Sequence, residues 1–331
     1  MGRLAGTVLA GTLLWAVVAA ACLCVGSTGN VAIPASRFAF QYRLEIVLLA
    51  SLIGAALAAA GTVYQAILRN PLADPYLLGV SSGASLLSLL WYVGALGGTT
   101  AALAAVGQQA FAFAGALLSI GLVLGIASRR GRLEPVTLIL VGVIVNAVNG
   151  SIYLLIYFRH PEIVSRGGEF MFLVGQIQTS LTSQQEWLAA ACAGIGWIVL
   201  FYLAGQLNVA PLGEAEAQAL GVRIHRLRWI GLGMASIITA SVVAISGPIG
   251  FVGLICPHLA RLIVGHDQRR LFPAATALGA ALLALADATS RYLSRENLFH
   301  TQMPVGVLTG LLGGPFFLLL LWQRRRSEGA I

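Results

Sequence analysis

The sequence predicts an all-α, polytopic membrane protein with about ten transmembrane helices and both termini in the cytoplasm. Of its 331 residues, 58% are hydrophobic and only 10% are charged. A soluble domain of this size carries about 25% charged residues, because its surface faces water. The 39 glycines are typical of transmembrane helices that pack closely. Residues 1–331 are therefore predicted to form one transmembrane domain, and an ordinary soluble enzyme is excluded.

Apolar stretches bounded by charged or turn residues are the candidate spans. The first follows Arg3 and is longer than the apolar region of about 7–15 residues in a signal peptide, so we expect it to be retained. Two stretches are short and are expected to cross obliquely or only part-way. The stretches lie at 5–26, 46–68, 81–96, 101–127, 135–158, 187–206, 227–246, 251–264, 272–293 and 304–322, the short ones being 81–96 and 251–264.

The distribution of positive charge predicts the topology. All 20 basic residues are arginines, and they form clusters at 129–132, 223–228, 269–270 and 324–326. Because arginine-rich loops stay on the cytoplasmic side, these clusters place both termini inside. The net charge of +8 does not indicate nucleic-acid binding, since no basic patch alternates with aromatic residues.

Two segments outside the spans are informative. Residues 159–186, on the outer side, contain a short apolar piece and are predicted to form an external segment at the membrane interface. On the inner side, residues 211–221 begin with a proline, carry Glu214 and Glu216 in their first turn and end at a glycine. This pattern predicts a short helix. An exposed helix of this kind either decorates the surface or docks a cytosolic partner.

Sequence motifs restrict the source of energy for any transport. The chain has no lysine and therefore no Walker A motif. Active transport would need either a separate ATPase or an ion gradient. Asp287 is the clearest ionisable residue at membrane depth, and Arg291 follows it at i+4, which favours a structural ion pair over a proton relay. A gradient-driven secondary transporter of a small solute remains the alternative.

Other motifs give no catalytic or metal site. Residues 79–83 match the G-x-S-x-G pattern of hydrolases, which requires a strand–turn–helix context, but here they begin a predicted transmembrane helix. The four cysteines and five histidines fit neither a zinc site nor a disulfide framework. No catalytic residue, metal site or bound cofactor is predicted. Glycines spaced by four residues predict close helix packing. They are Gly121 and Gly125, then Gly306, Gly310 and Gly314.

Two long runs resemble one family of membrane proteins. The first is QAILRNPLADPYLLGVSSGA at 65–84, and the second is SGPIGFVGLICPHLARL at 246–262. The second continues with Asp287 and Arg291, then PVGV at 304–307 and GGPFF at 313–317. In this order, over most of residues 40–322, the chain resembles the FecCD-type permeases, which are the membrane subunits of type II ABC importers for iron–siderophores, haem and vitamin B12.

The resemblance implies a permease, not an enzyme, that imports haem, an iron–siderophore or cobalamin across a bacterial inner membrane. It implies a homodimer with two ATPase subunits, which use ATP and Mg²⁺, and a periplasmic substrate-binding protein; membrane lipid is the other expected partner. It also makes 211–221 the helix that couples the permease to the ATPase. The residues assigned to coupling are Pro211, Leu212, Gly213, Glu214, Glu216, Ala219, Leu220 and Gly221.

The resemblance also implies a gate and a set of structural motifs. Asn70 and Leu72 match the residues that line a cytoplasmic gate. The motif residues are Pro71, Asp74, Pro75, Pro257, His258, Arg261 and Asp287.

Docking of the binding protein is the last implied role. In the family, arginines at the outer start of the second helix receive acidic residues of the binding protein. Here Arg43 matches the first arginine, and Ile46 stands where the second is usual. Arg291 matches a further docking arginine, and Arg295 is a candidate substitute for the lost charge. The alternative for Arg43 and Arg291 is that they anchor helix ends at the lipid headgroups.

Overall fold

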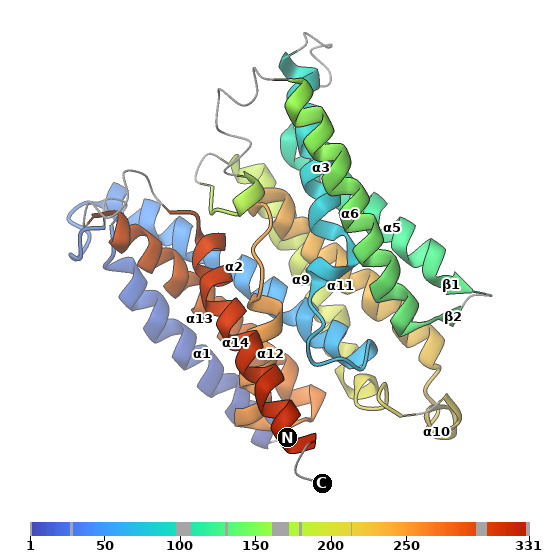
Figure 1. The fold of residues 1–331 in the computed structure, drawn as a ribbon. Coiled ribbons are helices and arrows are strands. Elements are labelled where there is room, and N and C mark those ends of the chain that lie inside the picture. The colour runs from blue at the N-terminus through green and yellow to red at the C-terminus, as the bar shows by residue number, and fades with distance from the viewer. Residues whose placement is uncertain are drawn as a thin grey trace.

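The computed structural model describes residues 2–26, 29–96, 107–129, 132–160, 172–178, 181–212, 214–295 and 303–328. They form a bundle of long helices, with the start of α1 and the end of α14 at the same end of the bundle (Figure 1). The helices are α1 (Gly2–Leu23), α2 (Arg37–Ile67), α3 (Val80–Leu96), α5 (Gln108–Ala127), α6 (Pro135–Arg159), α9 (Ser183–Leu207), α10 (Glu214–Ala219), α11 (Ile224–Ser246), α12 (Val252–Val264), α13 (Gln268–Arg295) and α14 (Val305–Glu328).

Helices dominate the described residues, as predicted. A 3₁₀ turn, η1, spans Pro75–Leu78, and two strands of two residues each, β1 (Ser128–Arg129) and β2 (Arg132–Leu133), pair between α5 and α6. Seven described helices are long and apolar enough to cross a membrane, and three shorter apolar helices accompany them. The all-α architecture is therefore confirmed, while ten crossings and cytoplasmic termini stay predictions.

Several helix boundaries differ from the prediction, and the start of α2 differs most. α2 begins at Arg37 rather than near residue 46, because the Ser36 side chain accepts a hydrogen bond from the backbone N–H of Ala39 (3.1 Å) and caps the helix. Charged residues in its first turns therefore belong to the helix, although they interrupt the apolar run. α10 covers only Glu214–Ala219, because Pro211 and Leu212 lie in the preceding turn.

The predicted external segment is described only in part. Residues 161–171 and 179–180 lie outside the described residues. Phe172–Val174 forms one helical turn, and Gly175 follows with a positive φ of 78°. The backbone N–H of Gln176 then donates to the Ser246 carbonyl oxygen (2.8 Å), which joins this segment to the end of α11.

α2 lies at the centre of the bundle. In its most apolar 18-residue window, 83% of the residues are buried. Close approach to its neighbours depends on glycine pairs: a Cβ at Gly54 would overlap the carbonyl oxygen of Gly279 on α13, and one at Gly61 would overlap that of Gly253 on α12. Backbones pack directly on each other there, as is typical of membrane helices.

Most of the glycines that are spaced by four residues do not bring two helix backbones together within the chain. A Cβ at Gly121, Gly125, Gly310 or Gly314 would meet nothing within 4 Å. Only Gly306 is in close contact, with the Val174 carbonyl oxygen. Close packing within the described chain is thus found at Gly306 and not at the other four glycines, and whether a second copy covers those four stays open. A spacing of four defines a helix face but does not say what covers it.

We expect Gly61→Ala to destabilise the permease by about 1–3 kcal/mol, because the new methyl group would displace the α12 backbone. Gly125→Ala is the matched control, since the space around Gly125 is open. Thermal unfolding in detergent measures both variants. Equal unfolding temperatures for the two would contradict the role of Gly61 in packing.

Candidate functional site

The predicted gate lies in a compact turn between α2 and α3. The Asn70 side-chain oxygen Oδ1 accepts a hydrogen bond from the backbone N–H of Leu72 (3.0 Å). Asp74 caps η1 by accepting from the N–H of Tyr76 (3.0 Å), and Gly79 ends η1 with a φ of 84°. Asn70 and Leu72 are both half-buried. The turn is therefore held by its own side chains and presents Leu72 at its partly exposed edge.

The two runs that carry the family resemblance contact each other. The side-chain nitrogen Nε2 of Gln65 lies 3.4 Å from the carbonyl oxygens of Gly253 and Leu254, and Arg261 donates to Oε1 of Gln65 (3.0 Å). These bonds join the end of α2 to α12. Because they pair a buried amide with backbone carbonyls and a guanidinium, they satisfy polar groups inside an apolar bundle.

A second set of contacts extends from η1. The Tyr76 hydroxyl accepts a hydrogen bond from the backbone N–H of Ile249, and Asn146 of α6 donates to the Tyr76 carbonyl oxygen (2.9 Å). Tyr76 thus connects the gate turn with α6 and with the segment between α11 and α12. Sequence analysis did not single out Tyr76, although it lies inside the first run.

The remaining motif residues have structural surroundings. Pro257 is buried inside α12. The His258 ring lies 5.7 Å from the ring of Phe316 in an edge-to-face arrangement, which joins α12 to α14. Ser81 is the serine of the G-x-S-x-G match, and it lies in the first turn of α3. The described chain has the 3₁₀ turn η1 before this helix, in place of a strand. The nucleophile-elbow context is therefore absent from this described part of the chain.

The predicted coupling residues form a small exposed element. Leu212 and Leu220 are 41% and 62% exposed, and Glu216 and Ala219 are also exposed. Ala217 faces inward and is fully buried. Gly213 and the side chain of Glu214 lie outside what the structure describes. Pro211 is exposed in the turn before α10, and Gly221 follows the helix with a φ of 76°.

Arg69 connects this element to the gate turn, and sequence analysis missed its role. Its Nε donates to the Ala210 carbonyl oxygen (3.1 Å), and its Nη2 donates to the carbonyl oxygen of Leu212. Its position directly before Asn70 was the available signal. Its acceptors are backbone atoms about 140 residues away, which no sequence motif encodes.

At the opposite end of the bundle, Arg43 is directed toward the loop that follows α1. Its Nη1 donates to the carbonyl oxygens of Leu23 (3.0 Å), Cys24 (3.2 Å) and Ala32 (2.6 Å). Two of these carbonyls belong to the C-terminal end of α1, where carbonyl groups lack helical partners. The geometry is that of an anchor for the loop, and docking by Arg43 stays a prediction.

Arg291 has a similar environment and is more deeply buried. It is 1% exposed, its Nε donates to Asp287 (2.9 Å), and its Nη1 donates to the Val25 carbonyl oxygen (2.6 Å). The predicted i,i+4 ion pair is therefore present. Arg295 ends α13, and its side chain is outside the described residues. A buried Arg291 offers no open surface to a partner in this conformation.

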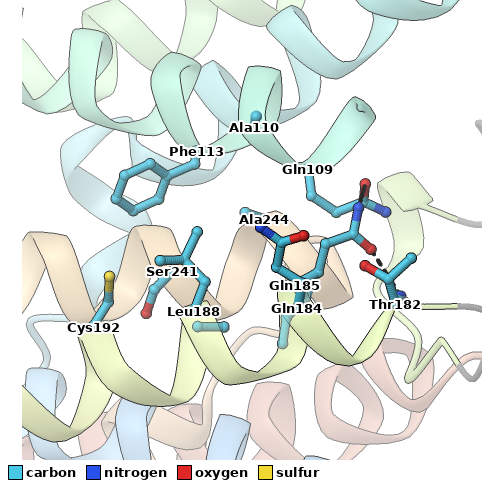
Figure 2. A pocket seen from close by; sticks show the side chains of 12 residues that line it. Gln109, Ala110, Phe113, Thr182, Gln184, Gln185, Leu188, Cys192, Ser241 and Ala244 are labelled. Carbon is cyan, nitrogen blue, oxygen red and sulfur yellow. Dashed lines mark hydrogen bonds between the residues drawn. The ribbon is translucent and has the colours of Figure 1, made fainter. Parts of the chain in front are cut away.

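A cavity of about 490 Å³ lies between α5, α9 and α11 (Figure 2). Its rim is polar: Gln185 donates to Gln109 (3.0 Å) and accepts from the backbone N–H of Thr182 (3.1 Å). Its apolar lining includes Phe113 and the buried Ile245. The lining has no acidic, basic or histidine side chain, and it includes the thiol of Cys192. Among the described residues, no three His, Cys, Asp or Glu side chains are grouped to hold a metal ion.

Comparison with known proteins identifies the family. Residues 6–323 match the FecCD transport family. The chain belongs to this family. It is 39% identical to the hemin transport system permease protein HmuU of Yersinia pestis, over 87% of this chain and 84% of that protein. It is 38% identical to the cobalamin import system permease protein BtuC of Halobacterium salinarum, over 85% of this chain and 72% of that protein.

Two further matches agree with this assignment. The iron(3+)-hydroxamate import system permease protein FhuB of Bacillus subtilis is 35% identical, over 86% of this chain and 71% of that protein. A solved structure described as an inward-facing metal-chelate type ABC transporter superposes with a TM-score of 0.79 at 29% identity, covering 96% of this chain and 98% of that one. The FecCD chain is therefore an ABC transporter permease, a multi-pass membrane subunit.

Proposed function

We propose that the chain is the permease of an ATP-driven importer that receives haem, a ferric siderophore or cobalamin from a periplasmic binding protein and carries it across a bacterial inner membrane. The match to the FecCD family over nearly the whole chain carries this proposal. The three relatives named above act on three different ligands at 35–39% identity. Sequence identity to these relatives therefore supports the class of ligand but does not distinguish between haem, ferric siderophore and cobalamin.

The proposed assembly is a homodimer with two ATPase subunits that bind ATP and Mg²⁺. In α6, only 11% of the most apolar window is buried, and its exposed side chains are large and apolar. Ile144, Val148, Ile152 and Leu155 are among them. A helix so exposed needs lipid or a second copy to cover it. The absence of lysine from the chain excludes a Walker A motif, which supports a separate ATPase.

The alternative, a gradient-driven carrier, has less support. Ion-coupled carriers use ionisable groups within the membrane to relay protons or bind ions. Asp287, the clearest candidate, is engaged by Arg291 at 2.9 Å and is 3% exposed. A carboxylate held in this way stabilises the end of α13 rather than exchanging protons with solvent.

Reconstitution tests the proposal. The permease is co-purified with its ATPase and placed in proteoliposomes, with the binding protein outside and ATP inside. We expect uptake of haem, a ferric hydroxamate or cobalamin that requires ATP and persists when proton and sodium gradients are collapsed. Uptake that needs a gradient and no ATP would establish the carrier instead.

We expect Leu72→Ala to make the permease leaky without ATP. Leu72 is half-buried at the edge of a rigid turn, so removal of its side chain opens apolar space without breaking the Asn70 hydrogen bond to its backbone. Passive efflux of preloaded ligand from proteoliposomes measures the leak. Leu122→Ala, at an exposed position of α5, is the control. A Leu72 variant as tight as the parent would argue against a gate at this turn.

A further inference from the structure

The charged side chain of Arg69 joins the predicted gate turn to the chain that leads into α10. Its Nε donates to the Ala210 carbonyl oxygen at 3.1 Å, and its Nη2 donates to that of Leu212. The guanidinium is a planar fork that suits two acceptors at once, whereas a lysine ammonium is a point charge. One side chain therefore holds residues 210–212, which lead into α10, beside Asn70.

The chain that leads into α10 has a second point of attachment at Asn208. The Asn208 side chain donates to Oδ1 of Asp267 (2.8 Å) and accepts from the N–H of Gln268 (2.8 Å). Asn208 thus ties the end of α9 to the turn between α12 and α13. Residues 210–212, which lie nearer to α10, are tied by Arg69 to the gate turn instead. The two attachments lead in different directions, and only the one through Arg69 leads to the predicted gate turn.

The backbone of Arg69 also requires an explanation. Its φ is 51°, and Phe251 is the other non-glycine residue with a positive φ in the described chain. This conformation is unfavourable for residues with a Cβ and is adopted readily by glycine. An arginine at this position therefore has a higher conformational free energy than a glycine would have. The contacts of its side chain supply a reason for it.

We propose that Arg69 is the positioning residue that transmits movement of the ATPase-docked segment to the cytoplasmic gate. The proposal rests on the function proposed above, in which α10 docks the ATPase. A shift of residues 210–212 must either break both guanidinium bonds or move Arg69, which is bonded through one peptide to Asn70 and lies three residues before Leu72. The gate turn then moves as a unit, because the Asn70 and Asp74 side chains hold it internally.

Two variants separate this link from a general structural role. Arg69→Ala keeps the unfavourable backbone and removes the bonds, while Arg69→Gly removes the bonds and relieves the backbone. Arg226→Ala is the matched control, because it removes one exposed positive charge from the first turn of α11, close after α10. Hydrogen exchange of each permease in detergent is measured first. The amides of Val209, Ala210 and Leu212 are suitable reporters, since each donates to a backbone carbonyl.

We expect both Arg69 variants to exchange these amides about tenfold faster than the parent, with α11 unchanged and Arg226→Ala like the parent. In proteoliposomes, we expect ATP hydrolysis to persist while uptake per ATP falls about tenfold, for whichever of haem, ferric hydroxamate or cobalamin the parent carries. Parent-like exchange, or parent-like uptake per ATP in Arg69→Gly, would overturn the proposal. If the parent itself shows no ATP-driven uptake, the proposed function fails, and the exchange measurement still decides whether Arg69 holds the segment.

Discussion

Proline in place of Ala217 is expected to abolish ATP-driven uptake while the permease still folds into the membrane. Ala217 is fully buried in the middle of α10, a helix of six residues at the edge of the bundle (Figure 1). Proline inside a helix costs about 3 kcal/mol, because it removes an N–H donor and clashes with the preceding turn. Such a short helix cannot absorb that cost, so the exposed surface of Leu220 and Glu216 would lose its shape.

Ala215→Pro is the matched control for this experiment. Ala215 is exposed and lies in the first turn of α10, where proline is tolerated. Expression and size-exclusion profiles report folding, and ligand-stimulated ATP hydrolysis together with uptake reports coupling. Reversal of charge by Glu216→Arg should weaken coupling without breaking the helix. Normal uptake by Ala217→Pro would remove the coupling role from this segment.

Most of the helices could be predicted from the sequence, because long apolar stretches leave few alternatives. The spans predicted at 135–158 and 227–246 correspond to α6 at Pro135–Arg159 and α11 at Ile224–Ser246. The start of α2 was predicted too late because polar residues in its first turns interrupt the apolar pattern. Local capping by Ser36, rather than hydropathy, decides that boundary.

The parts of the site that depend on distant contacts could not be predicted. The resemblance predicts where the gate turn lies, and the structure adds that Tyr76 joins this turn to Ile249 and that Arg69 joins it to Leu212. Both contacts end on backbone atoms, so the partner residues carry no recognisable side-chain signal. The same holds for Gly61, whose neighbour on α12 is a carbonyl oxygen. Patterns along one helix predict a face, and tertiary packing selects its partner.

Removal of Arg291 is expected to destabilise the permease by about 3–5 kcal/mol, whether or not a binding protein is present. Arg291 is 1% exposed and pairs with a carboxylate that is 3% exposed, so Arg291→Ala leaves Asp287 buried without its counter-charge. The Val25 carbonyl oxygen loses its donor at the same time. Thermal unfolding in detergent measures the loss, and Arg37→Ala, at an exposed position at the start of α2, is the control.

The double variant Asp287→Asn with Arg291→Met distinguishes an unpaired charge from lost packing. Replacing both partners removes the buried charge, so much of the stability should return. A docking role predicts the opposite pattern: Arg291→Ala and Arg43→Glu would unfold like the parent but bind the binding protein more slowly, most clearly at low salt, where charge steering is strongest. Arg43 donates to three carbonyl oxygens around the end of α1. We therefore expect Arg43→Glu to loosen that loop and to lower the unfolding temperature. Any slower association of the binding protein should be seen together with this loss of stability.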